Sequence, residues 1–234
     1  IGDRSPSRGL GDVYKRQVGL RGGNNPAADS SAGMISQASA VALFTMPPVV
    51  FAIVHVFVSE EQENGIWGVV RARNGKIGRL LVSRLGTALL FLLVWALGYA
   101  GALAALVAFH YSLGESIDVF PFFCALLVSV ISTAFVIATA HLRLGGLVPA
   151  AVAALALSVV GVSLIGETSL VWAVFPMGAL ISGAPFRDVD PAQPLLGYEL
   201  NPDAMLGLGI SLAAAALLAL GIFGYLKTQL GKEK

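Results

Sequence analysis

Three histidines offer the clearest chemistry in this sequence, and they lie in three separate segments. His55 falls near one end of an apolar stretch, where an ionisable group is a candidate for moving a proton or a substrate. A neutral, hydrogen-bonded imidazole is commoner near an interface, so both interpretations stay open. His110 is expected at a membrane interface, and His141 and Arg143 predict a tight turn that anchors the topology. Because the histidines and the single cysteine, Cys124, lack ligand spacing, we expect no metal site.

Proline is the second residue type with a mechanical role here. Pro47 and Pro48 are adjacent inside an apolar stretch, and such a pair removes two backbone donors and kinks or breaks a helix. The pair would form a hinge, line a cavity, or make a static bend against which neighbours pack, and we favour the static bend. Pro176 interrupts another apolar stretch in the same way. Together with His55, these prolines are the candidate gating or pathway residues.

The sequence lacks the groups that catalysis within a membrane would need. Intramembrane enzymes use a pair such as Ser and His, two Asp, or a His-Glu metal motif, whereas the carboxylates here lie in predicted loops. Asn74-Gly75-Lys76 lacks the spaced glycine and the hydroxyl of a phosphate cradle. No basic cluster of the kind that binds nucleic acid is present either. We therefore expect no catalytic residue, no bound cofactor and no nucleotide site in this chain.

The elements that position these residues must lie in lipid. Of the 234 residues, 56% are hydrophobic and 12% are charged, with a mean hydropathy of +0.78, whereas soluble domains carry about 25% charged residues. We predict an all-α integral membrane protein, because a chain in hydrocarbon must satisfy its own backbone hydrogen bonds. Five apolar stretches free of Lys, Arg, Asp and Glu are long enough to span a membrane. They are about 39–58, 85–109, 119–140, 144–165 and 204–226.

The basic residues predict the orientation of these spans. Nine Lys or Arg residues fall in the segments 59–84 and 141–143 and in the tail 227–234, whereas the alternate loops carry only Arg187. Basic loops stay in the cytoplasm, so the first group is expected there. We expect a multi-pass protein of the bacterial cytoplasmic membrane, with its C-terminus in the cytoplasm.

Five spans and a cytoplasmic C-terminus would start the chain outside the cell. Residues 1–17 resemble a translated sequencing-adapter read-through, and we expect them to be a non-native leader. Residues 18–38 are expected to be an external polar segment that precedes a transmembrane domain at 39–226. We expect one upstream span to be missing, which would give the complete protein six. The apolar stretch 169–185, broken by Pro176, is expected to be a re-entrant or interfacial element on the external side rather than a further span.

The loop between the first two spans carries the most informative pattern. Glu61 and Glu63 follow the span, Gly65 and Trp67 come next, and a basic stretch begins at Arg71. Acidic residues favour the start of a short helix, and most of the apolar residues that follow share one side of a helical wheel. The pattern predicts either a short interfacial helix presented to a cytoplasmic partner or a basic loop lying on anionic lipid. Spacing alone does not separate the two.

Acidic residues after a span, then Gly-x-Trp, then a basic stretch leading into a long apolar helix resemble the first cytoplasmic loop of type-2 ATP-binding-cassette (ABC) exporter permeases. The pattern here runs from Glu61 through Gly65 and Trp67 into the basic stretch from Arg71. The six-span plan and the long, proline-broken last external loop are similar to that family as well. The small size resembles its lantibiotic-immunity and peptide-export members.

The resemblance implies that the first cytoplasmic loop is a coupling helix that docks on a separate ABC ATPase subunit. ATP and Mg would then be bound by that partner, and two copies of this chain, or this chain with a sister permease, would enclose the path of an amphipathic peptide, drug or lipid-like substrate. The alternatives are a secondary transporter and a non-transporting membrane assembly subunit. The interface residues would be Glu61, Glu63, Gly65, Trp67 and Arg71.

Overall fold

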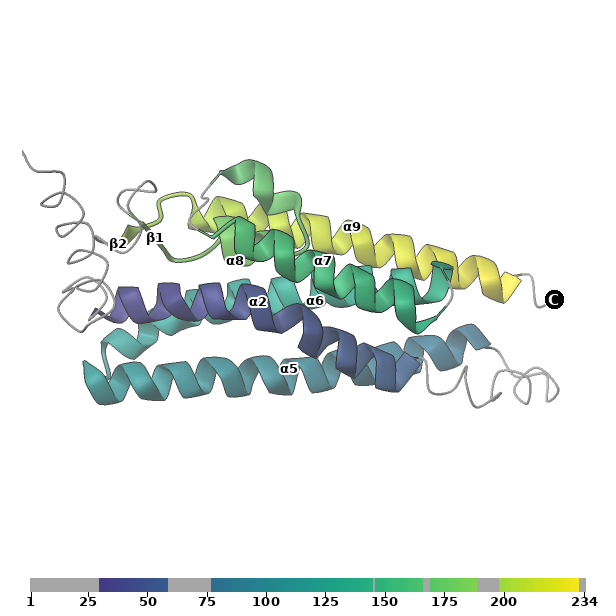
Figure 1. Ribbon diagram of the computed structural model, residues 1–234, viewed down its shortest axis with the longest axis horizontal. Coiled ribbons are helices and arrows are strands. Elements are labelled where there is room, and N and C mark those ends of the chain that lie inside the picture. The colour runs from purple at the N-terminus through teal and green to yellow at the C-terminus, as the bar shows by residue number, and fades with distance from the viewer. Residues whose placement is uncertain (1–29, 59–76, 145, 166–168, 189–197, 232–234) are drawn as a thin grey trace, which may run out of the picture.

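The structure of the protein is a computed structural model, and five stretches of the chain are described in it. They are residues 30–58, 77–144, 146–165, 169–188 and 198–231. Within these stretches the chain is mostly helical, and the principal helices run side by side along the long axis of the molecule (Figure 1). These helices are α2 (Ser31–Val58), α5 (Ile77–His110), α6 (Val119–Leu144), α7 (Leu147–Ser163) and α9 (Ala204–Gly231).

Four helices in the described part of the chain are long and apolar enough to cross a membrane. They are Ser31–Phe57, Arg79–His110, Glu115–Leu144 and Ala204–Tyr225. The shorter α7 is also apolar, but its 17 residues extend over about 26 Å, less than the hydrocarbon core of about 30 Å. The chain is therefore a helical, multi-pass membrane protein, with four helices of spanning length among the described residues where the sequence predicted five.

The helices extend beyond the charge-free stretches that predicted them. α2 begins at Ser31, inside the stretch 18–38 that was expected to be an external polar segment. The Ser30 hydroxyl caps it by accepting a hydrogen bond from the backbone N–H of Gly33 at 3.0 Å. α5 likewise begins before its apolar stretch and includes Arg84. A charge-free stretch shows which part of a helix can lie in lipid. The helix itself ends where its backbone hydrogen bonds end, which can be beyond that stretch.

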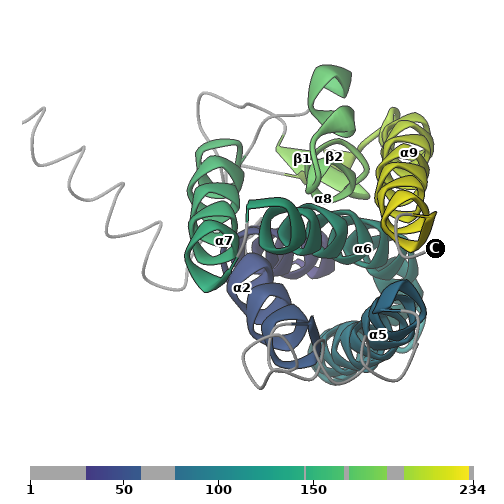
Figure 2. The same ribbon diagram turned by 90° about the vertical axis from the view of Figure 1, so that its right-hand side faces the viewer.

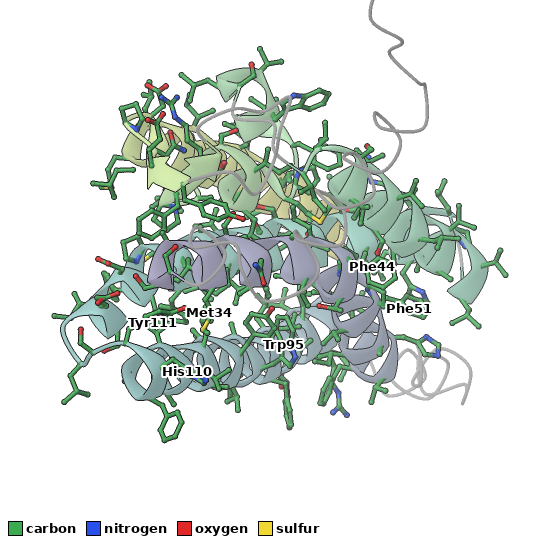
Figure 3. All side chains as sticks on the ribbon, turned by 60° about the vertical axis from the view of Figure 1, so that its left-hand side comes forward. Met34, Phe44, Phe51, Trp95, His110 and Tyr111 are labelled. Carbon is green, nitrogen blue, oxygen red and sulfur yellow. The ribbon has the colours of Figure 1, made fainter. Side chains whose placement is uncertain are left out.

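α6 lies at the centre of the bundle, with α2 and α7 on one side of it and α9 on the other (Figure 2). Its fully buried side chains Phe122, Leu126 and Ile137 belong to the core. α5 packs against α2, α6 and α9. Figure 3 shows Met34 of α2 and Trp95 of α5 in the space between those two helices, where both are partly buried. α6 is thus the element against which the other helices are positioned.

The bundle has two different ends. At one end a short 3-10 helix, η1 (Glu115–Asp118), joins α5 to α6, and a hairpin forms from β1 (Phe186–Asp188) and β2 (Tyr198–Leu200). The two strands are antiparallel, and Arg187 pairs with Glu199 through an ion pair of 2.7 Å. The hairpin adds a strand element to a fold that the sequence predicted to be helical throughout. We call this the hairpin end.

The opposite end is where α2, α6 and α9 finish and where α5 begins (Figure 1). We call it the basic end, because the described residues place Arg79 and Arg84 in the first turns of α5 and Arg143 in the last turn of α6. The segment 59–76 joins the end of α2 to the start of α5, so both of its attachment points lie here.

Candidate functional site

α2 changes direction near its middle (Figure 1). The adjacent Pro47 and Pro48 occupy the middle of its sequence. Pro47 is buried and Pro48 is exposed. In a regular helix these two residues would donate to the carbonyl groups of Leu43 and Phe44, but proline has no N–H to donate. The bend therefore leaves two backbone carbonyls in need of other partners.

α7 provides a hydrogen-bond donor at the bend. The Ser158 hydroxyl donates to the Phe44 carbonyl oxygen at 3.1 Å, across 114 residues of sequence. One turn further along α7, a Cβ atom placed on Gly161 would lie 3.2 Å from the Leu43 carbonyl oxygen, so the glycine lets the two backbones approach closely. The Ser158 hydroxyl thus provides a partner for one of the two carbonyls, and Gly161 lets α7 lie directly against the bend.

Replacing Ser158 with alanine is expected to lower the free energy of unfolding by about 1–2 kcal/mol, because the Phe44 carbonyl loses the partner that the buried Ser158 hydroxyl provides. Ser163→Ala is the matched control, since the Ser163 hydroxyl is exposed and donates within its own helix to Val160. Chemical unfolding in mixed micelles, followed by tryptophan fluorescence, measures both variants. Equal effects of the two substitutions would show that the Ser158 hydrogen bond does not stabilise the bend.

His55 and His141 meet in the structure, although they lie in different helices. Their ring centroids are 6.3 Å apart, with the planes inclined at 71°. His141 is only 2% exposed, and His55 stacks on Phe51 with centroids 5.7 Å apart. The tight turn that the sequence predicted at His141 and Arg143 is instead the last turn of α6, where packing against α2 buries the imidazole. This pair joins the end of α2 to the end of α6.

Two further aromatic contacts join neighbouring helices to the ends of α2 and α6. The guanidinium carbon of Arg143 lies 4.9 Å from the centre of the Tyr225 ring and thereby joins α6 to α9. Phe57 of α2 lies against Phe91 of α5, with ring centroids 5.0 Å apart. No group of three or more potential metal ligands occurs among the residues that the structure describes.

The apolar stretch that follows α7 is broken into two short helices rather than forming one. These are η2 (Leu170–Val174) and α8 (Gly178–Ser182), with Pro176 between them. Phe175 has the extended backbone that a residue before proline prefers, with ψ of 150°. The Ser182 hydroxyl donates to the Ser169 carbonyl at 3.0 Å, so the segment folds back on itself. The stretch 169–185 is thus a folded-back pair of short helices in the structure.

Side chains of α6 and α9 satisfy the irregular backbone of this segment. The Ser129 hydroxyl of α6 accepts from the backbone N–H of Leu180 at 3.1 Å, and the Ser211 hydroxyl of α9 donates to the Ala173 carbonyl at 2.7 Å. The side-chain amide of Asn201 donates to the carbonyl oxygens of Ser182 and Ala184, at the C-terminal end of α8. A broken helix is tolerated within a bundle only where neighbours replace its lost hydrogen bonds, and these three residues do so.

Sequence reasoning missed the hydroxyl and amide groups that hold the bend and the broken segment. For the three serines the available signal was their position, because a polar side chain inside an apolar stretch needs a hydrogen-bond partner, whereas Asn201 lies outside those stretches and gave no such signal. Their partners lie in other helices and could not be identified before the fold. The missed residues are Ser129, Ser158, Asn201 and Ser211.

The residues predicted for a coupling helix lie outside the described residues, within the segment 59–76. They are Glu61, Glu63, Gly65, Trp67 and Arg71. Among the predicted gating residues, the structure places Pro47, Pro48 and His55 along α2, and Pro176 in the broken segment near the hairpin end. The structure does not bring Pro176 together with His55.

These features define the class: a helical, multi-pass membrane protein with a bent helix, a broken apolar segment and a histidine pair. Comparisons with protein-family models, with curated proteins and with solved structures found no match to this chain.

Proposed function

We propose that this chain is the membrane-spanning permease subunit of an ABC exporter and that it does no covalent chemistry itself. Five spans, with α7 counted among them, would cross the bacterial cytoplasmic membrane and leave the C-terminus in the cytoplasm. Two copies, or this chain and a sister permease, would enclose the path of an amphipathic peptide, drug or lipid-like substrate. A separate subunit would bind ATP and Mg and drive transport.

One observation carries the proposal. The segment 59–76, with acidic residues, Trp67 and then a run of basic residues, is attached at the basic end of the bundle. Basic ends face the cytoplasm, which is where a soluble ATPase would meet the permease. Trp and Arg are the residue types that dominate interface energies, and this loop offers both. The bend in α2 supports the proposal as well, because the loop continues directly from the bent helix.

The experiment that tests the proposal is co-purification with an ABC ATPase, whose gene we expect beside the gene for this chain. Trp67→Ala and Glu61→Ala are expected to weaken the association by at least about tenfold. Glu199→Ala at the hairpin end is the matched control and is expected to leave the association unchanged. If all three variants retain the ATPase equally, the loop is not the docking site.

Orientation is checked in the same strains. In a Cys124→Ser background, Gly68→Cys should react with a membrane-impermeant maleimide only after the cells are permeabilised. Leu113→Cys, which is exposed at the hairpin end, should react in intact cells. Labelling of position 68 from outside would place the loop beyond reach of the ATPase and would end the proposal.

A secondary transporter is the second candidate, and the contact between His55 and His141 is the observation that favours it. Ionisable groups inside a bundle are the usual means of coupling transport to protons. Such a protein would need no ATPase, so the absence of any association in the co-purification experiment would favour this candidate.

A further inference from the structure

Met177 of the broken segment inserts its side chain beside Gly161 of α7. Met177 directly follows Pro176 and begins α8, and it is fully buried. Its terminal methyl group overlaps the position that a Cβ atom on Gly161 would take, and its sulfur lies 3.4 Å from that position. Because glycine has no side chain, α7 leaves a space that the methionine occupies. The broken segment is thereby joined to α7 next to the proline that breaks it.

The bend in α2 borders the same space. α7 packs along α2 (Figure 2), and the carbonyl oxygen of Leu43 lies 3.2 Å from the position of a Cβ atom on Gly161. In a regular helix this carbonyl would accept from residue 47, but Pro47 has no N–H. Met177 thus lies in a notch between Gly161 and the Leu43 carbonyl. The two proline-disrupted elements of the protein meet there, although they are far apart in the sequence.

The notch leaves little room for these elements to shift independently. On α2, Met46 and Val50 flank the prolines and are fully buried, so the bend is packed in place. Methionine is usually an adaptable side chain, but full burial restricts Met177 to the space that its neighbours leave. Packed interiors have low compressibility and transmit displacements between elements. A shift of the Leu43 carbonyl would therefore displace Met177 and the chain on either side of it.

We propose that Met177 couples the broken segment to the bend in α2, so that the geometry of α2 at its prolines sets the position of η2 and α8. The coupling joins two packed elements and needs no hinge within α2. Because the segment 59–76 continues from α2, a displacement of that loop in an exporter would reach the broken segment through this contact. That consequence rests on the proposed function, whereas the coupling itself does not.

Spin labels on the broken segment test the coupling without any partner protein. In a Cys124→Ser background, nitroxides at Val171→Cys on η2 and Leu97→Cys on α5 occupy exposed positions. Pro47→Ala restores an N–H four residues after Leu43 and so changes the geometry of the bend. Pulsed EPR in lipid nanodiscs should then show the main distance between the labels shifted by about 2 Å or more.

Truncation of Met177 determines whether this contact carries the effect. Met177→Ala empties the notch, so adding Pro47→Ala to it should leave the distance unchanged. Val41→Ala, which shortens an exposed side chain of α2 before the bend, is the control for Pro47→Ala and should change the distance in neither background. A label pair at Leu97→Cys and Leu217→Cys, which omits the broken segment, should give the same distance in every variant.

A second pair of substitutions tests the notch itself. Gly161→Ala places a methyl group where Met177 lies, and it should lower the melting temperature. Met177→Ala should lower it as well, because it leaves a cavity. The double variant should melt above Gly161→Ala alone, since the shortened side chain makes room for the new methyl group. Losses that simply add would show that the two residues do not share this space.

The coupling is wrong if Pro47→Ala leaves the distance to η2 unchanged, or if it shifts this distance equally with and without the Met177 side chain. Circular dichroism shows whether each variant is folded. If Pro47→Ala fails this check, the melting temperatures of the Gly161 and Met177 variants decide. Because no ATPase is present, these results are independent of the co-purification experiment. Docking through Trp67 can hold while the coupling fails, and the reverse is equally measurable.

Discussion

Replacing Gly207 with alanine is expected to destabilise the protein, because α8 and α9 touch through their backbones at this position. A Cβ atom on Gly207 would lie 2.5 Å from the carbonyl oxygen of Ser182, 2.7 Å from its carbonyl carbon and 3.0 Å from the backbone nitrogen of Gly183. Backbone atoms cannot rotate away as a side chain can, so α8 would have to move off α9. We expect the free energy of unfolding to fall by about 3 kcal/mol.

Gly209 is the matched control, two residues along the same helix. A Cβ atom there would meet nothing within 4 Å. Alanine is a better helix former than glycine by up to about 1 kcal/mol, so Gly209→Ala should leave stability unchanged or raise it. Thermal unfolding in detergent, followed by circular dichroism, should therefore give shifts of opposite sign at the two positions. A Gly207→Ala variant that melts at or above the wild-type temperature would contradict the close approach.

A substitution at Gly183, which caps the end of α8, tests the same contact between α8 and α9 independently. A Cβ atom on Gly183 would lie 2.7 Å from the Ala179 carbonyl oxygen and 3.1 Å from the backbone nitrogen of Leu208. Gly183→Ala should thus resemble Gly207→Ala rather than Gly209→Ala. The two glycines together let the broken segment lie directly on α9.

Replacing Asn201 with alanine is expected to cost a similar amount, because one side chain satisfies three backbone groups. The Asn201 amide nitrogen donates to the carbonyl oxygens of Ser182 and Ala184, each at 3.0 Å. Its side-chain oxygen accepts from the backbone N–H of Asp203 at 3.1 Å, just before α9 begins. Asn201 is 7% exposed, so water cannot freely replace these bonds. We expect a loss of about 3 kcal/mol and a fall in melting temperature of about 5–10 °C.

Glu199→Ala is the control for Asn201→Ala, because Glu199 lies two residues earlier, in β2, and its removal leaves no buried polar group without a partner. The ion pair between Glu199 and Arg187 is well exposed, and such pairs contribute about 0–1 kcal/mol. The expected result is a large shift for Asn201→Ala and a small one for Glu199→Ala in the same melting experiment. Similar shifts would mean that the hairpin as a whole, and not the amide, holds α8 to α9.

The apolar stretches located the helices well, and they did so for a local reason. Whether a run of residues can lie in hydrocarbon depends on the side chains in that run alone, so the absence of charges over 85–109 or 119–140 was enough to place a helix there. Helix ends were less predictable. The cap at Ser30 and the inclusion of Arg84 in α5 depend on backbone hydrogen bonds that hydropathy does not describe. α7, at 17 residues, is likewise shorter than the stretch 144–165 that predicted it.

The sequence did not predict which residues on different helices contact each other. His55 and His141 were interpreted separately, as a pathway group and a turn, because no spacing links residues on different helices. The sequence analysis did not single out Ser158, because its hydroxyl reaches the Phe44 carbonyl only once α7 lies against the bend in α2.

The sequence by itself determined that this protein lies in lipid, that it does so as helices, and where its prolines would bend or break them. Only the tertiary structure decided which groups meet: two histidines at the basic end, a serine against a proline bend, and an asparagine at the end of a broken helix. The reason is physical. Solubility in hydrocarbon and loss of an N–H at proline are properties of single segments, whereas the partner of a buried polar group is set by how the shapes of several helices fit together.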